Sequence, residues 1–165
     1  MREMRRFKQL LSAEDTAAIL KRNTNGVLAV MGDEGYPYAV PVSYVYEEGK
    51  IYFHSGKQGH KMDALRSSEK VSFCVVDTDQ IVPEEYTTYF RSVIAFGKPR
   101  IVEEDGEKLH ALQILGRKYH PAGTEEYLNH YIQKEYAPVC IVAIDIDHMT
   151  GKEAIEFVRA KEGQR

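Results

Sequence analysis

Large and small side chains alternate between positions 36 and 46, and this pattern predicts a β-strand. Even positions carry large residues and odd positions mostly small ones, in the order Tyr36, Pro37, Tyr38, Ala39, Val40, Pro41, Val42, Ser43, Tyr44, Val45 and Tyr46. A period of two puts successive side chains on opposite faces of a strand. Pro41 has no amide hydrogen to donate, so we expect this strand at the edge of a sheet or bulged at that residue.

Five other segments show the apolar runs or the alternation typical of strands, at residues 27–31, 51–54, 71–76, 89–102 and 139–146. Helices are predicted after the N-cap residue Ser12, from His60 to about Ser67, over 109–119 and after Thr124. Four strands follow one another as a meander, which argues against a parallel sheet of alternating strands and helices. We therefore predict a mainly β fold, a six-stranded antiparallel barrel with peripheral helices, in one domain spanning 1–165. Its core covers about residues 12–150, and a short helical tail follows.

Composition and charge narrow the classes of function. The 165 residues carry a formal net charge of −3, so no basic field is available to hold nucleic acid or an anionic membrane. The longest apolar runs, 27–31 and 139–144, are far shorter than the roughly 20 residues of a membrane span. The basic N-terminus leads into no apolar signal core, and we expect a cytoplasmic protein. Cys74 and Cys140 have no Cys or His at metal-ligand spacing, which favours free thiols over a metal site, a disulfide or a nucleophile.

The segment 53–65 is the stretch most indicative of chemistry. Gly56 and Gly59 free the backbone after a strand, and Lys57, His60 and Lys61 gather at the start of a predicted helix. Amides and the positive end of the helix dipole bind phosphate groups at such a place, and lysine adds a mobile charge. Both a phosphate cradle and a solvated basic loop fit this pattern. The spacing is that of neither a Walker loop nor a dinucleotide fingerprint, so ATP and NAD are not indicated.

The order and spacing of several short motifs resemble the pyridoxamine phosphate oxidase-like flavoproteins and, within them, the nitroimidazole-resistance (Nim) branch. The motifs occupy 40–44, 51–55, 59–61, 71–76, 89–97 and 150–153, so the resemblance covers roughly residues 4–155. It implies a split β-barrel homodimer with FMN in each of two clefts between subunits. Deazaflavin-using and haem-binding proteins also occur among these relatives, and the loop that bears Lys and His favours FMN.

The resemblance also implies roles for individual residues. The isoalloxazine ring would be lined by Pro41, Val42, Ser43 and Tyr44. The ribityl phosphate would be held by His54, Ser55, Lys57, Gly59, His60 and Lys61. Arg91, Ser92 and Val93 would reach the flavin from the partner subunit or from an adjacent strand. The alternatives are a strand end satisfied by backbone for His54 and a surface ion pair for Arg91. Tyr119 and His120 are expected to pack rather than to cap the substrate side.

Together these observations predict an FMN-dependent oxidoreductase that passes electrons from a reduced nicotinamide or another donor to a small flat acceptor such as a nitroaromatic. The flavin carries the redox chemistry, so no acid–base dyad is needed. The alternatives are a non-catalytic flavin- or haem-binding module, a related oxidase with a different substrate, and a structural barrel. An arginine-rich C-terminal segment like that of the vitamin-pathway oxidases is not found, so oxidation of pyridoxamine phosphate is not expected. The large-residue face of 36–46 and the strand from Tyr89 to Phe96 are expected to contribute to a dimer interface.

Overall fold

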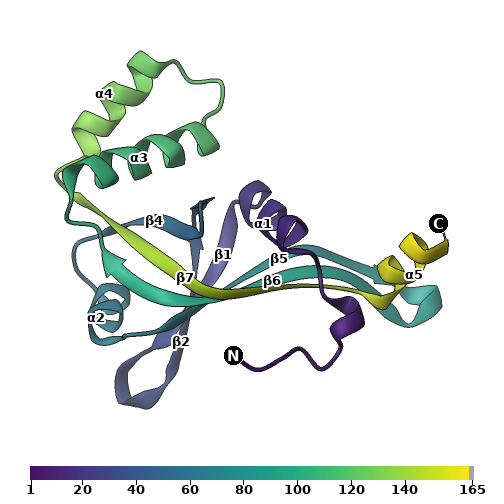
Figure 1. Ribbon diagram of the computed structural model, residues 1–165. Coiled ribbons are helices and arrows are strands. Elements are labelled where there is room, and N and C mark those ends of the chain that lie inside the picture. The colour runs from purple at the N-terminus through teal and green to yellow at the C-terminus, as the bar shows by residue number, and fades with distance from the viewer. Residues whose placement is uncertain (164–165) are drawn as a thin grey trace.

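The computed structural model describes residues 1–163 and shows one curled antiparallel sheet accompanied by five α-helices (Figure 1). The strands are β1 (Asn25–Met31), β2 (Pro37–Ser43), β3 (Val45–Glu47), β4 (Lys50–Gly56), β5 (Val71–Val82), β6 (Thr87–Ile101) and β7 (Val139–Glu153). The helices are α1 (Ala13–Arg22), α2 (His60–Ser67), α3 (Asp105–Tyr119), α4 (Glu125–Glu135) and α5 (Ile155–Gly163). The strand order is β2-β1-β5-β6-β7-β4-β3. The prediction of a mainly β, antiparallel fold is thereby confirmed.

The predicted count of six strands is wrong, because the segment 36–46 forms two strands rather than one. β2 ends at Ser43 and pairs with β1, whereas β3 begins at Val45 and pairs with β4. Tyr44 lies between them, outside the ladder, and its amide faces the carbonyl oxygen of Thr24 at 3.3 Å. Since β2 and β3 are the two ends of the sheet, this one-residue link requires the sheet to curl until its ends meet. Pro41 lies in the end strand β2, as expected for a residue that cannot donate to a ladder.

The predicted helices are present, and the strands of one hairpin are longer than predicted. The Ser12 hydroxyl caps α1 by accepting the amide hydrogen of Asp15 at 3.0 Å. β5 extends to Val82, and β6 begins at Thr87. The two strands form an arm that reaches α5, away from α3 and α4 (Figure 1). The predicted bend near Gly97 is a shift of register between β6 and β7. A Cβ there would lie 2.3 Å from the carbonyl oxygen of Asp145, so a side chain does not fit.

Two hydrophobic cores lie on opposite faces of the sheet. The larger core fills the interior of the curl, where Phe53 and Phe73 are fully buried. The smaller core lies outside β4 and β7, where Tyr52 packs with Ala111 and Leu115 of α3. Consecutive residues of β4 thus point into different cores, as the period of two requires. Burial on both faces of β4 and β7 holds the α3–α4 pair against the sheet.

Part of the outer face of the sheet, on β2, β1, β5 and β6, carries an uncharged surface. The register aligns two rows across β2, β1, β5 and β6, which we call the outer-face patch: Pro41, Val27, Cys74 and Ile94, and beside them Ala39, Ala29, Ser72 and Phe96. Val27, Ile94 and Phe96 are 36, 42 and 37% exposed. On the opposite, large-residue face of β2, Val42 and Tyr44 are buried in the chain's own core. These two side chains are therefore not available to an interface, and a contribution from the rest of this face stays a prediction. None of the helices within residues 1–163 has the length and apolar character needed to cross a membrane.

Candidate functional site

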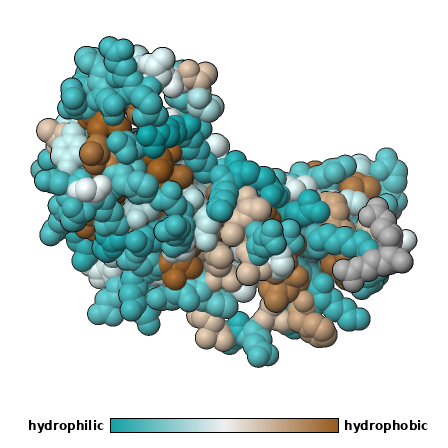
Figure 2. Space-filling model, turned by 45° about the horizontal axis from the view of Figure 1, so that its top comes forward, coloured by the Kyte–Doolittle hydropathy of each residue, from teal (hydrophilic) through white to brown (hydrophobic). Residues whose placement is uncertain are grey.

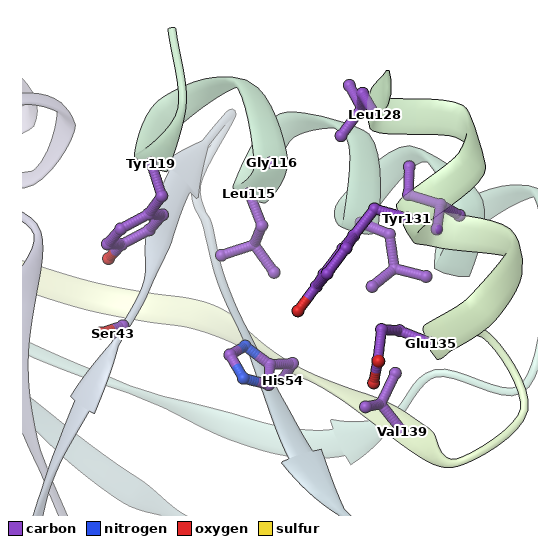
Figure 3. A pocket seen from close by; sticks show the side chains of 11 residues that line it. Ser43, His54, Leu115, Gly116, Tyr119, Leu128, Tyr131, Glu135 and Val139 are labelled. Carbon is purple, nitrogen blue, oxygen red and sulfur yellow. The ribbon is translucent and has the colours of Figure 1, made fainter. Parts of the chain in front are cut away.

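A cavity of about 330 Å³ lies between the α3–α4 helices and strands β2 and β4 (Figure 3). Its apolar walls come from Leu112, Leu115, Gly116, Leu128, Ile132 and Val139. Its polar groups come from Ser43, His54, Tyr119, Tyr131 and Glu135. Apolar atoms are visible between these helices and the sheet at the upper left of Figure 2. This size, with apolar walls and a few polar groups, is typical of a small-molecule site.

Two of the predicted flavin contacts, Ser43 and His54, meet at this cavity. Ser43 is the last residue of β2, directly before the break in the sheet. His54 lies on the outward face of β4 together with Tyr52, whereas the next residue, Ser55, faces the interior and is only 6% exposed. His54 and Ser55 were predicted to hold one phosphate together. Their side chains lie on opposite faces of β4, so the structure does not bring them to one ligand.

Tyr119, the last residue of α3, closes the gap in the sheet at Tyr44. The amide of Tyr44 donates to the Tyr119 hydroxyl at 2.8 Å, and this hydroxyl also faces the carbonyl oxygens of Tyr44, at 3.0 Å, and Thr24. The Tyr119 hydroxyl thus makes the hydrogen bonds to the Tyr44 backbone that a neighbouring strand would otherwise make. Burial raises the pKa of Tyr119, so the hydroxyl keeps its proton at neutral pH. The expected packing role therefore includes specific hydrogen bonds next to Ser43.

Lys118 fixes the same end of α3 to the sheet. Its ammonium group donates to the carbonyl oxygen of Asn23 and lies 4.5 Å from the centre of the Tyr44 ring. Burial lowers the pKa of Lys118 to about 8. Lys118 and Tyr119 therefore bind backbone groups directly after α1 and at the β2–β3 junction, and they fix the C-terminal end of α3 to the sheet.

Four of the predicted phosphate residues lie together where β4 leads into the start of α2, in residues 57–61, which we call the basic turn. All are exposed except half-buried Lys61. Gly59 precedes α2 with a φ of +111°, a conformation that strains any residue with a side chain, and nothing lies within 4 Å of a Cβ added there. The His60 ring stacks on Tyr38 with centroids 4.2 Å apart. Lys57 and Lys61 form no ion pair within residues 1–163. The basic turn therefore presents two ammonium groups beside an open helix N-terminus.

Arg91, Ser92 and Val93 lie in β6 and do not line the cavity. The Val93 side chain is fully buried in the sheet's interior and offers no surface to a ligand. The Arg91 guanidinium lies 3.3 Å from the Glu153 carboxylate and 4.1 Å from the centre of the Phe157 ring. Within one chain, Arg91 thus forms the ion pair expected under the alternative interpretation. A contact of these residues with a flavin bound by a second chain stays a prediction.

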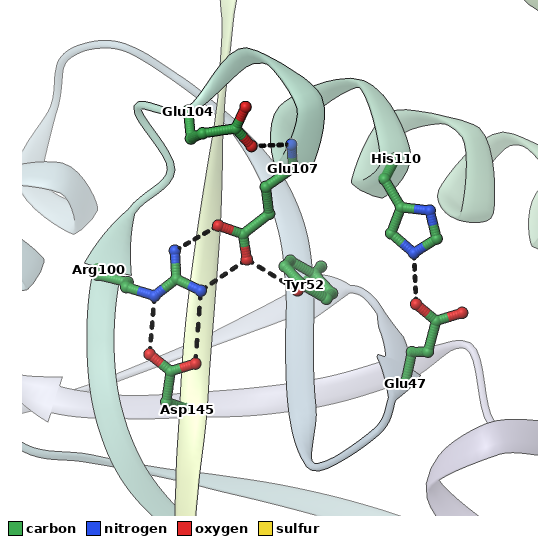
Figure 4. Close-up of polar contacts among 7 residues, drawn as sticks. All are labelled: Glu47, Tyr52, Arg100, Glu104, Glu107, His110 and Asp145. Atoms are coloured by element: carbon green, nitrogen blue, oxygen red, sulfur yellow. Dashed lines mark hydrogen bonds and ion pairs between the residues drawn. The ribbon is translucent and has the colours of Figure 1, made fainter.

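A polar network anchors α3 to the sheet (Figure 4). The Arg100 guanidinium on β6 donates to the two oxygens of Glu107 in α3 at 2.7 and 2.6 Å and to Asp145 on β7 at 2.7 Å. The Tyr52 hydroxyl donates to Glu107 at 2.9 Å. These hydrogen bonds, the one from Arg100 first, lower the pKa of Glu107 to about 2. No group of three or more His, Cys, Asp or Glu within residues 1–163 could hold a metal ion.

Sequence reasoning missed most of the cavity. The spacing of Leu112, Leu115 and Tyr119, and of Leu128 and Ile132, predicts two helices with an apolar stripe. Such a stripe ordinarily packs flush against a sheet, and nothing in the sequence signals that two helices leave space beside β4.

Comparisons with known proteins agree with this architecture. A family model described as pyridoxamine 5'-phosphate oxidase matches residues 12–153. A candidate 5-nitroimidazole antibiotic resistance protein of Bacteroides thetaiotaomicron is 26% identical with a TM-score of 0.74, over 87% of this chain and 86% of that one. An FAD-binding protein of Mesorhizobium loti is 25% identical with a TM-score of 0.60, over 88% and 96%. A conserved hypothetical protein of Mycobacterium tuberculosis shares the fold at 22% identity with a TM-score of 0.78, over 92% and 90%. No curated protein sequence matches the chain.

Proposed function

The chain belongs to the pyridoxamine 5'-phosphate oxidase family, and on this basis we propose that it binds FMN and acts as an oxidoreductase on a small flat acceptor such as a nitroaromatic. The observation that carries the proposal is the outward face of β4. This face leads from His54 in the cavity, past the open position at Gly56, to the basic turn. One continuous surface thus joins a cationic end to an apolar end. The descriptions of the Bacteroides and Mesorhizobium relatives support the acceptor class and the flavin, respectively.

The chemistry of the basic turn fits the phosphate of FMN. Lys57 and Lys61 have no carboxylate partner within the described chain, whereas His60 lies 3.7 Å from the Asp33 carboxylate and is already engaged. Two ammonium groups and the first amides of α2 suit a phosphate monoester, because ammonium groups and unpaired helix amides both stabilise its negative charge. The absence of a dinucleotide fingerprint in the sequence favours FMN over FAD.

The surface near Ser43 fits the flavin ring. Pro41 and Ser43 are exposed and small, so a flat ring can approach the backbone of β2 closely, whereas the buried side chains of Val42 and Tyr44 leave only their backbone for contact. A bound flavin supplies the electron transfer. The chain's own residues position the ring and, through the apolar walls under α3 and α4, keep water from the acceptor.

The proposed FMN site is completed by a second copy of the chain that docks on the outer-face patch. An uncharged sheet face of this extent is typical of an interface, and it includes Pro41 of the proposed ring contact. Sedimentation of the purified protein should give a dimer. Phe96→Glu should give monomers with weakened FMN binding, whereas Ile81→Glu, at the far end of the β5–β6 arm, should leave the dimer intact. A monomeric parent protein at micromolar concentration would contradict this part of the proposal.

The absorption spectrum of the purified protein tests the cofactor. Two maxima in the near-ultraviolet and blue, with FMN released on denaturation, are the expected result. Release of FAD, a single Soret band, or colourless protein that takes up no added FMN would each contradict the proposal. Turnover is then tested with a reduced nicotinamide and a nitroaromatic acceptor. Tight FMN binding without turnover of any donor and acceptor pair would instead support a non-catalytic flavin-binding module.

A further inference from the structure

The cavity beneath α3 and α4 has a charge asymmetry that the proposed function does not use. Glu135 is the only carboxylate among its described lining residues, and none of them is Lys or Arg. Glu135 is half-buried and forms no ion pair within residues 1–163. Figure 3 shows its carboxylate on the same side of the cavity as His54 and the Tyr131 hydroxyl. The Glu135 carboxylate is therefore a single unpaired negative charge among mostly apolar lining residues.

The ends of both helices adjoin the cavity, and lysines of α3 bind the backbone near them. α3 ends at Tyr119 and α4 ends at Glu135, and both terminal residues line the cavity. The C-terminal end of a helix carries a partial negative charge, and at the end of α4 this charge meets the Lys108 ammonium, which donates to the carbonyl oxygen of Tyr136 at 2.7 Å. Two lysines of α3, Lys108 and Lys118, donate to the carbonyl oxygens of Tyr136 and Asn23, and neither lines the cavity. His54 is the only lining residue that can become cationic.

The apolar walls set the size and shape of a ligand. An apolar cavity of about 150 Å³ takes up benzene, and this cavity of about 330 Å³ is roughly twice as large. Leu115, Leu128 and Ile132 offer apolar contact, and the Tyr131 ring offers an aromatic face. A compound of one or two aromatic rings therefore fits the space.

We propose that this cavity binds the electron acceptor and selects aromatic compounds with a cationic or hydrogen-bond-donating substituent, which Glu135 receives, over compounds with a carboxylate. This inference rests on the proposed function in one respect, because Ser43 and His54 place the cavity next to the proposed flavin. The selection itself follows from charge. An amine gains a charge-assisted hydrogen bond, whereas a carboxylate meets a like charge with no compensating lysine or arginine.

Three probes of matched size and different charge test the selection without any need for turnover: 2-naphthylmethylamine, 2-naphthylmethanol and 2-naphthoate. Their dissociation constants are measured by calorimetry, with the protein as purified and again after its flavin is removed. The amine should bind about 1.5- to fivefold more tightly than the alcohol, the range expected of a partly exposed charge pair. The carboxylate should bind weakest. Glu135→Gln should bring the amine to the level of the alcohol.

A matched control separates a local contact from overall charge. Glu126 lies on the same helix, is exposed, and does not line the cavity, so Glu126→Gln removes the same charge without touching the site. This variant should keep the parent's preference. If 2-naphthoate binds as tightly as the amine, or if Glu126→Gln and Glu135→Gln act alike, the proposed selection is wrong.

A second variant locates the probes. A Cβ added at Gly116 would lie 2.2 Å from Leu128 Cδ1, so Gly116→Ala displaces the Leu128 side chain, which lines the cavity. Alanine is also the better helix former, and α3 should remain folded. All three probes should weaken together; unchanged affinities would mean that they bind elsewhere. Loss of probe binding on saturation with FMN would show that the flavin occupies the cavity and would overturn the acceptor assignment. Failure of the protein to bind any flavin would contradict the proposed function alone, because probe selection is also measured without flavin.

Discussion

The basic turn and the cavity both adjoin the C-terminal end of β4, yet they are built in opposite ways. The basic turn consists of five consecutive residues and gains its character from lysine charges and an open helix end. The cavity draws residues from Ser43 to Val139, and its character comes from how α3 and α4 stand off from the sheet. The first region is a local property of the sequence, whereas the second exists only after folding. Changes at the two regions should therefore affect different ligands.

The largest effect is expected at the basic turn. Lys61→Ala removes a charge-assisted hydrogen bond to the FMN phosphate, which is typically worth roughly 1.5–3 kcal/mol, so FMN affinity should fall about ten- to a hundredfold. Riboflavin lacks the phosphate, and its weaker affinity should barely change. Titration of both flavins into the parent and the variant measures the difference.

The control for this comparison is Lys70→Ala, which removes an exposed lysine beyond α2. It should leave both flavin affinities unchanged. Should riboflavin lose as much affinity as FMN in Lys61→Ala, the lysine acts on the ring or on the fold, and the phosphate does not lie in the basic turn.

A smaller effect is expected at the cavity end. Tyr119→Phe removes the hydroxyl that accepts the Tyr44 amide, so we expect a loss of about 1 kcal/mol in the free energy of unfolding. Tyr127→Phe is the control, because that hydroxyl forms no hydrogen bond within residues 1–163 and the residue is 58% exposed. Urea unfolding of the parent, Tyr119→Phe and Tyr127→Phe measures the change in stability that each substitution causes. Equal stability of Tyr119→Phe and the parent would show that the sheet break does not depend on α3.

The smallest effect is a pH dependence of the α3 anchor. The pKa of Glu107 is lowered in the folded chain from its ordinary 4.5 to about 2, first by the hydrogen bond from Arg100. Its contribution to stability is therefore fully present above pH 4.5 and is lost as the pH falls toward 2. Because Arg100 is 37% exposed, water screens the pair and the loss should be at most about 1 kcal/mol. Urea unfolding at pH 5, 4 and 3 should show this loss of stability in the parent and not in Glu107→Gln.

The sequence predicted most of the fold because its elements have local signals. The alternation at 36–46, the Ser12 cap and the basic turn each depend on neighbours within a few residues. The break at Tyr44 has no such signal, because β2 pairs with β1 and β3 pairs with β4, and the curl of the whole sheet sets these two strands at its opposite ends. Strict alternation along β4 places His54 and Ser55 on opposite faces of the strand, so the sequence pattern alone already separates their side chains.

The candidate site was predictable only where its chemistry is contiguous. Lys57, His60 and Lys61 were found together in the sequence and lie together in the structure. Glu135 and Tyr131 had no distinguishing pattern, since tyrosines and glutamates are ordinary residues of an amphipathic helix. Their importance comes from a gap between packed elements, which depends on side-chain volumes in several segments at once.

The α3–α4 pair leaves the sheet and rejoins it at adjoining points. Ile101 at the end of β6 is paired with Val142 of β7, and the amide of Val102 donates to the carbonyl oxygen of Ile141 at 2.9 Å. The intervening segment is thus an excursion whose ends already meet. Insertions, deletions or exchanges inside it leave the strand register untouched, since a loop can change length at little entropic cost once its ends are fixed. Evolution or design can therefore remodel this excursion, and with it the compounds that are recognised, provided that residues such as Glu107 and Tyr119, which bind it to the sheet, are kept.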